Sequence, residues 1–187
     1  MRKKHIATIV LSMFALVGCS EFLGDADSMD IDVDRVLFDF PATVEGSGSA
    51  GGEAVNSFTT FRTLDISDIG SRRVTEFADI IIGLEVERAS LIVSALDNRE
   101  YLIKNLSVMA DVPDSPQVIE TTLTGRESVA GEGMRNFIRE IVSRLVAGDE
   151  VVVSISGHTD APADTRLNID LESAIEFFAD PQRVRME

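Results

Sequence analysis

The sequence has 187 residues and a mass of 20.3 kDa, a length that favours one domain with short appended segments. Hydrophobic residues make up 44% and charged residues 26%, as in a folded rather than a disordered protein. The formal net charge of −15 argues against nucleic-acid binding, which needs a basic surface to neutralise phosphates. One Cys and two His exclude a disulfide framework and a Cys/His zinc site, and no cofactor is expected.

Residues 1–18 are typical of a signal peptide. Residues 2–4 are basic, and residues 6–17 form a mostly apolar run. This run is shorter than the roughly 20 apolar residues that cross a bilayer, so a membrane-spanning helix is not expected here.

The run ends in Leu16-Val17-Gly18-Cys19, which resembles the lipobox of bacterial lipoproteins. The resemblance implies that the Cys19 thiol receives a diacylglyceryl group, that the chain is cleaved before Cys19, and that the new amino group is acylated. Several acyl chains make a lasting anchor, because each buried CH₂ contributes roughly 0.8 kcal/mol. Ser20 follows the Cys, which in this family favours the outer membrane. The alternative is a lone buried Cys behind an ordinary signal peptide.

Residues 19–35 are predicted to form an acidic tether between the lipid and the domain, because they are rich in Asp and poor in large apolar residues. The spacing Asp30-x-Asp32-x-Asp34 resembles the start of a calcium loop. However, Arg35 and Pro41 stand where that loop needs Gly and Glu. We therefore expect a solvated linker and no metal site.

Apolar residues alternate with polar ones in seven later segments, as half-buried strands require. These segments are 36–44, 54–66, 84–96, 101–110, 118–125, one that begins at 151, and 167–177. The phase of the alternation changes near Arg88, which predicts a β-bulge there. Residues 46–52 are a Gly/Ser-rich loop, Pro113 and Pro116 break another connection, and 160–164 are predicted as a hairpin loop.

Two amphipathic helices are predicted between the strands. The first would be capped by Asp68 or Ser71 and would end at Gly83. The second covers 134–146, where apolar residues recur at the spacing of one helix face, and Gly148 follows it.

The predicted fold class is mainly β (α+β): an antiparallel β-sandwich with two amphipathic helices over 36–180, followed by a tail at 181–187. The elements do not alternate as in a doubly wound sheet, and the strands are expected to follow one another mostly as hairpins. The pattern is similar to the uncharacterised β-sandwich lipoprotein domains common in Gram-negative bacteria, especially Bacteroidota.

Gly157-His158-Thr159-Asp160 resembles the signature of OmpA-like peptidoglycan-binding domains. In that family the Asp of this motif and an Arg of the following helix hold the diaminopimelate of the cell wall. Asp160 matches, but Ile175 stands at the Arg position, and the apolar alternation of 167–177 favours a strand there. We expect a turn with His158 at its edge, and keep His158 and Asp160 as candidate ligand-binding residues.

The sequence gives little support to an enzyme. After cleavage, His158 would be the only imidazole, and Ser154, Ser156 and Asp160 lie too close to it along one strand and turn to converge as a triad. The 32 acidic residues supply many carboxylate pairs, so their number is no argument for glycoside hydrolysis. The chain is therefore predicted to be non-enzymatic, with Cys19 as its lipidation site.

The leading hypothesis is an outer-membrane lipoprotein whose domain binds an envelope protein or an extracellular ligand, with the lipid anchor as its contact with the membrane. Loops on a rigid sandwich usually carry binding, which points to 45–53, 97–100, 111–117 and 158–166. The alternatives are peptidoglycan attachment through Asp160, a small-molecule or lipid carrier, and a pilus or adhesin subunit.

Overall fold

The computed structural model describes residues 29–46, 55–111, 117–124, 127–180 and 182–183. The predicted signal peptide, the lipidation site Cys19 and the first part of the tether lie outside these residues. The same holds for most of the Gly/Ser-rich loop, for Pro113 and Pro116, and for most of the predicted tail.

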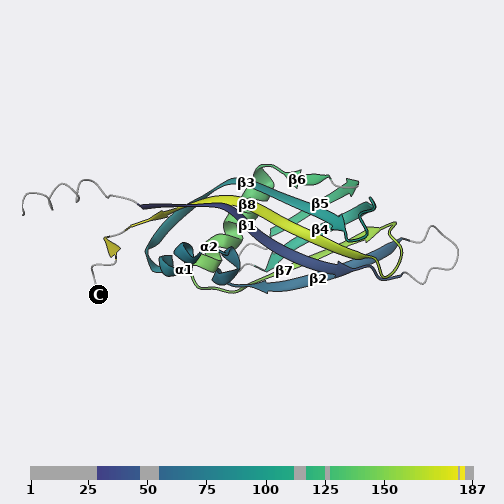
Figure 1. Cartoon of the computed structure of the whole chain (residues 1–187), viewed down its shortest axis with the longest axis horizontal. Coiled ribbons are helices and arrows are strands. Elements are labelled where there is room, and N and C mark those ends of the chain that lie inside the picture. The colour runs from purple at the N-terminus through teal and green to yellow at the C-terminus, as the bar shows by residue number, and fades with distance from the viewer. Residues whose placement is uncertain (1–28, 47–54, 112–116, 125–126, 181, 184–187) are drawn as a thin grey trace, which may run out of the picture.

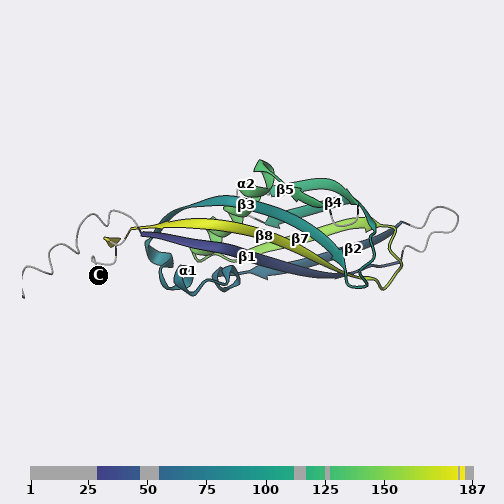
Figure 2. The ribbon, with the colours of Figure 1, turned by 45° about the horizontal axis from the view of Figure 1, so that its top comes forward.

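The described chain is mostly β and forms two antiparallel four-stranded sheets in a β-sandwich-like fold (Figure 1). The strands are β1 (Met29–Thr43), β2 (Asn56–Leu64), β3 (Ile81–Ala95), β4 (Leu102–Asp111), β5 (Gln117–Thr124), β6 (Ser128–Ala130), β7 (Val151–Thr159) and β8 (Arg166–Ala179). Sheet A has the order β1-β8-β3-β6 and sheet B the order β2-β7-β4-β5. Figure 2 shows β1, β8 and β3 running side by side along the molecule.

Successive strands alternate between the two sheets. Only β4 and β5 are neighbours both in sequence and in a sheet, and every other connection between described strands passes from one sheet to the other. The prediction of a hairpin at 160–164 is therefore wrong, because β7 lies in sheet B and β8 in sheet A. Both strands bury their apolar rows in the same core from opposite sides, so alternation alone could not tell the sheets apart.

Strand β1 begins inside the predicted tether. Met29 pairs with Ala179 of β8, and Ile31 is 2% exposed. The prediction of a solvated linker is therefore wrong for residues 29–35. Asp30 and Asp32 are the outward half of an alternating strand whose inward half is apolar.

The first predicted helix is shorter than its pattern indicated. α1 covers Arg72–Glu76, between the 3₁₀ turns η1 (Ile66–Ile69) and η2 (Ala78–Ile80). Ser71 is its N-cap, as one alternative predicted, and accepts a hydrogen bond from the Val74 N–H. Gly83 does not end a helix: β3 begins at Ile81, where the chain joins β8.

The second helix and the bulge are confirmed. α2 covers Glu132–Val146, and the register of β3 against β8 shifts between Val86 and Arg88. Sequence patterning missed β6, which has only three residues and therefore no visible alternation.

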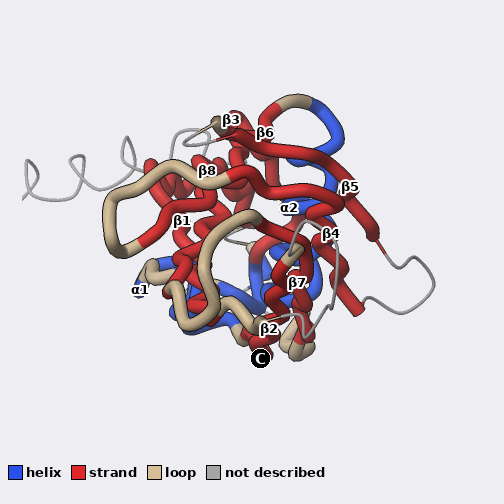
Figure 3. The backbone as a smooth tube through the Cα atoms, turned by 90° about the vertical axis from the view of Figure 1, so that its right-hand side faces the viewer, coloured by secondary structure: helices blue, strands red, loops and turns tan. Residues whose placement is uncertain are grey.

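The interior is filled by side chains from both sheets and from α2. Phe38 and Phe40 of sheet A, Phe58 of sheet B and Phe137 of α2 are all at most 1% exposed. Figure 3 shows the strands of the two sheets around the interior in which α2 lies. Each such side chain adds roughly 1.5–3 kcal/mol through burial. One face of α2 therefore contributes to the core, while Asn136, Arg139 and Ser143 on its other face are exposed.

Arg62 of edge strand β2 joins the two sheets along one side. Its guanidinium donates to the Asp39 carbonyl oxygen at 3.2 Å and to the Asp39 carboxylate at 2.8 Å, and also to the Asp68 carboxylate. Thr60 adds a hydrogen bond of 2.9 Å to the Pro41 carbonyl of β1. The edges of β1 and β2 are thus joined by side-chain hydrogen bonds.

Candidate functional site

The described parts of three of the four predicted contact loops meet at one end of the molecule, the end opposite Met29 (Figure 1). The Val44 N–H donates to the Thr165 carbonyl at 2.9 Å, and the Leu96 N–H donates to the Arg166 carbonyl at 3.0 Å. We call this the loop end, made by the described parts of 44–56, 95–102 and 159–166. Asp111, where the fourth predicted loop starts, lies at the end of β4 that is farther from the loop end.

Two residues of the Gly157–Asp160 motif serve the core. A Cβ at Gly157 would lie 2.8 Å from Cζ of Phe58, so only glycine leaves room for the ring. Thr159 is 2% exposed, and its hydroxyl accepts a hydrogen bond from the Ala161 N–H at 3.1 Å. The packing of the strand end therefore accounts for this half of the motif.

Asp160 also has a structural partner. Its carboxylate accepts a hydrogen bond of 2.8 Å from the Leu102 N–H, and its own N–H donates to the Leu102 carbonyl at 3.4 Å. These two bonds extend the pairing of β7 with β4 by one residue beyond Thr159. The carboxylate thus fixes the first residue of β4.

His158 lies on the outer surface of sheet B, exposed, with Ser57 and Lys104 as its neighbours across the strands. The partner position of the peptidoglycan motif falls on Ile175, which is 2% exposed in the core, and β8 takes the place of a helix. The structure therefore does not bring an Arg to Asp160 from that position, as the resemblance would require.

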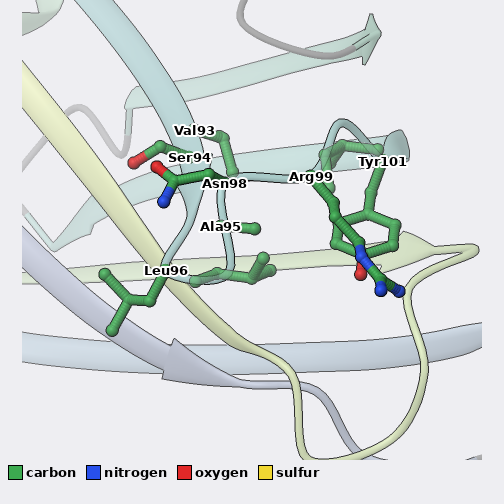
Figure 4. A pocket seen from close by; sticks show the side chains of 9 residues that line it. Val93, Ser94, Ala95, Leu96, Asn98, Arg99 and Tyr101 are labelled. Atoms are coloured by element: carbon green, nitrogen blue, oxygen red, sulfur yellow. The ribbon is translucent and has the colours of Figure 1, made fainter.

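A pocket of about 200 Å³ opens at the loop end beside the turn from β3 to β4 (Figure 4). It is lined by Val93, Ser94, Ala95, Leu96, Asn98, Arg99, Tyr101, Ile103 and Leu167. Five of these residues are apolar, while Ser94, Asn98, Arg99 and Tyr101 supply polar groups. A volume below the roughly 300–1,000 Å³ of ordinary ligand pockets suits one side chain or a small group better than a whole small molecule.

Hydrogen bonds within the turn hold the rim of the pocket. The Tyr101 hydroxyl donates to the Asp97 carboxylate at 2.7 Å, and the Arg99 N–H donates to the same carboxylate at 3.0 Å. The bond from Tyr101 is the main cause that lowers the pKa of Asp97, and the same bond raises the pKa of Tyr101. Asn98 adopts φ 60°, a left-handed conformation that Asn tolerates in turns.

Sequence reasoning named the loop 97–100 but neither Arg99 nor Tyr101 as site residues. The only signal was Asp97-Asn98, a turn pair whose side chains fold back onto the backbone. That signal locates a turn, whereas the pocket also needs Leu167 from β8, which lies far away in the sequence.

The outer face of sheet A is acidic. Glu176 of β8 lies between Asp32 of β1 and Glu85 of β3. Desolvation by burial is the largest cause that raises the pKa of Glu176, followed by repulsion from these and other nearby carboxylates. Among the residues the structure describes, no group of three or more His, Cys, Asp or Glu is arranged to hold a metal ion.

No family model matches this chain, and no curated protein matches it. Among solved structures, one of Desmodium yellow mottle tymovirus is similar at 8% identity and a TM-score of 0.31, over 80% of this chain and 83% of that one. TmCBM61 in complex with β-1,4-galactotriose is similar at 9% identity and a TM-score of 0.28, over 83% of this chain and 90% of that one. Likeness at this level carries no argument about fold or function.

Within the described part of the chain, the helices are too short or too polar to pass through a bilayer.

Proposed function

We propose that the chain is an outer-membrane lipoprotein, anchored through lipid at Cys19, that binds another protein without catalysing a reaction. The proposal starts from the signal peptide at 1–18 and from Leu16-Val17-Gly18-Cys19, which resembles a lipobox. The acidic chain would be repelled by anionic headgroups, so the lipid is its contact with the membrane.

The observation that carries the binding role is the placement of the chain entry and the loops at opposite ends. β1 enters at Met29 and runs for 15 residues to Thr43, next to the loop end. At about 3.3 Å per residue this strand spans roughly 50 Å. An anchor shortly before Met29 therefore leaves the loop end pointing away from the bilayer, where a partner can reach it.

The size and chemistry of the pocket favour a protein as the ligand. A space of about 200 Å³ holds one inserted side chain, and the five apolar lining residues favour an aliphatic or aromatic one. Leu96, which is 63% exposed at the same end, adds apolar surface beside the pocket. The partner we propose is an envelope or extracellular protein that inserts one apolar side chain there.

Metabolic labelling with a palmitate analogue tests the anchor. Wild type should be labelled and Cys19→Ala should not, because Cys19 is the only thiol in the chain. Equal labelling of the two would remove the anchor from the proposal and leave the binding role to be decided separately.

Photo-cross-linking in the native envelope tests the binding end. A photo-activatable residue at Asn98, on the pocket rim, should capture a partner, while one at Asp79, at the opposite end, should not. Filling the pocket with Ser94→Trp should then abolish capture from Asn98. Capture from Asp79 alone, or capture that Ser94→Trp leaves intact, contradicts the proposed binding end.

A further inference from the structure

On the outer face of sheet B, the central residues of β2, β7 and β4 are uncharged, although the protein carries a net charge of −15. The central face is formed by alternate residues of β2, β7 and β4: Thr59, Phe61, Thr63, Val152, Ser154, Ser156, Ser107 and Met109. Phe61 is 75% exposed, Met109 43% and Val152 40%, and they are three of the most exposed large apolar side chains described. We call this the neutral face.

The strand register places the neutral face in ordered rows across the three strands. Phe61, Ser154 and Met109 form one row, so that two large side chains flank a small one. The next row towards the loop end is Thr59, Ser156 and Ser107, in which all three are small. Large and small rows are thus adjacent along the strands.

Charged residues border the neutral face. One of them is Glu120 of β5, the fourth strand, which pairs with Ser107 of β4. The charges at the two ends of β4 differ in sign. At the loop end, Lys104 of β4 lies beside His158, both exposed. At the opposite end, Asp111 of the same strand lies beside Val152. Strand β4 is therefore basic at one end of the neutral face and acidic at the other.

We propose that the neutral face is a docking surface for a second copy of this chain. A two-fold axis that crosses the strands between Ser154 and Ser156 would place each copy's large row over the partner's small row. Phe61 would then rest on Thr59 of the second copy. The same axis places Lys104 of each copy over Asp111 of the other, so the arrangement is complementary in both size and charge.

The charge of the rest of the molecule limits where two copies can meet. Carboxylates line the outer face of sheet A, where Asp32, Glu176 and Glu85 stand abreast, and two such faces would repel each other. The neutral face of β2, β7 and β4 has no such row of carboxylates, and the acidic residues that pair with its members are Glu120 of β5 and Asp111 of β4.

The expected pair is weak. The neutral face covers about 20 Å along three strands that together are about 14 Å wide, on the order of 300 Å² per copy. Stable protein pairs bury about 800 Å² per partner, so the two copies should exchange freely rather than form a permanent dimer.

Cysteine cross-linking of the full chain in the cells that produce it tests the proposal. Ser156→Cys lies beside the proposed axis and should give a dimer with a bismaleimide of about 10 Å reach, matching the roughly 10 Å between packed sheets. Ser90→Cys, on the outer face of sheet A, is the matched control and should give none. Labelling with a mono-maleimide establishes that both thiols are accessible.

Variants of the neutral face test which residues the two copies contact. In the Ser156→Cys background, Phe61→Asp should abolish the dimer, and Lys104→Glu should reduce it several-fold. Adding Asp111→Lys to Lys104→Glu should restore it, since the pairing is then reversed rather than lost. The proposal is overturned if Ser156→Cys gives no dimer, or if it gives no more dimer than Ser90→Cys. It is also overturned if the charge reversal fails to restore the dimer.

Discussion

The ring of Phe58 lies directly against Gly157, and a Cβ at Gly157 would come within 2.8 Å of Cζ and 3.0 Å of Cε1 of that ring. Phe58 is 1% exposed, so the ring has no free space into which it can turn. We expect Gly157→Ala to lower the free energy of unfolding by about 1–3 kcal/mol, the usual cost of overpacking a core. Urea denaturation followed by circular dichroism measures this change.

A double-mutant cycle separates this clash from other effects of alanine at the same position. In a Phe58→Leu background the shorter side chain leaves room, so Gly157→Ala should cost much less than it does in wild type. Ser156→Ala, one residue away on the outer face, should change stability by no more than about 0.5 kcal/mol. An equal cost of Gly157→Ala in both backgrounds would show that the ring is not the cause.

The sequence predicted the buried rows of the strands but not how the strands are shared between sheets. Alternation identified which residues of β7 and β8 point inward, and both rows are buried. It could not show that β7 pairs with β2 and β4, because pairing depends on contacts between distant segments. The hairpin prediction at 160–164 was wrong for this reason. The linker prediction was wrong for residues 29–35 because their outward Asp residues suggested a solvated segment, although the inward residues of the same strand are apolar.

The candidate site was predictable to a similar extent. Loops 97–100 and 158–166 were named from turn residues, and both lie at the loop end. The role of Asp160 could not be derived from the motif, because its hydrogen-bond partner, the Leu102 N–H, is set by the pairing of β4 with β7. The neutral face could not be predicted from the sequence either, because its residues come together only once three strands distant in the sequence are placed in register.

Among the described residues, the Oγ of Ser173 is the one buried side-chain polar atom without a hydrogen-bond partner. It is 3% exposed in β8, between Val36 of β1 and Ala89 of β3. A hydroxyl buried without a partner loses its hydrogen bonds to water with no compensation. Ser173→Ala should therefore raise the free energy of unfolding by about 1 kcal/mol, measured as a higher urea midpoint with unchanged slope. A lower midpoint would mean that the hydroxyl has a bound partner such as water.

Glu176 should make stability depend on pH. Burial and neighbouring carboxylates raise its pKa above the ordinary value of 4.5, so the folded chain binds this proton more tightly than the unfolded chain does. The free energy of unfolding therefore falls as pH rises from 4.5 through the raised pKa. Asp170 acts in the same direction, because burial and the charge of Asp39 raise its pKa above 3.8.

Glu176→Gln removes the carboxylate and tests this dependence. The thermal midpoint of the variant should exceed that of wild type near pH 7, and the two should converge near pH 4, where the wild-type carboxyl is largely protonated. Glu100→Gln, exposed at the loop end, controls for the change in net charge. An equal gain from the two substitutions near pH 7 would contradict a specific effect of the cluster around Glu176.

Arg62 should contribute more than an ordinary surface ion pair, because one guanidinium joins Asp39 and Asp68 on two different elements. We expect Arg62→Ala to lower the free energy of unfolding by about 1–2 kcal/mol. Arg62→Lys keeps the charge, but its compact ammonium lacks the two separate arms with which the guanidinium reaches Asp39 and Asp68, so it should recover only part of the loss. Urea denaturation at low and high salt measures the stability of both variants. Full recovery of stability in Arg62→Lys would show that the charge alone accounts for the contribution of Arg62.

Asp160 gives a test that separates a structural role from cell-wall binding. Its carboxylate accepts the Leu102 N–H, and an asparagine side chain can accept the same bond through its carbonyl oxygen. Asp160→Asn should therefore keep most of the stability, while Asp160→Ala should lose about 1 kcal/mol. In a sedimentation assay with purified peptidoglycan, neither variant should differ from wild type. If wild type is retained and Asp160→Asn is released although it remains as stable, the charge of Asp160 binds the cell wall and the structural assignment is incomplete.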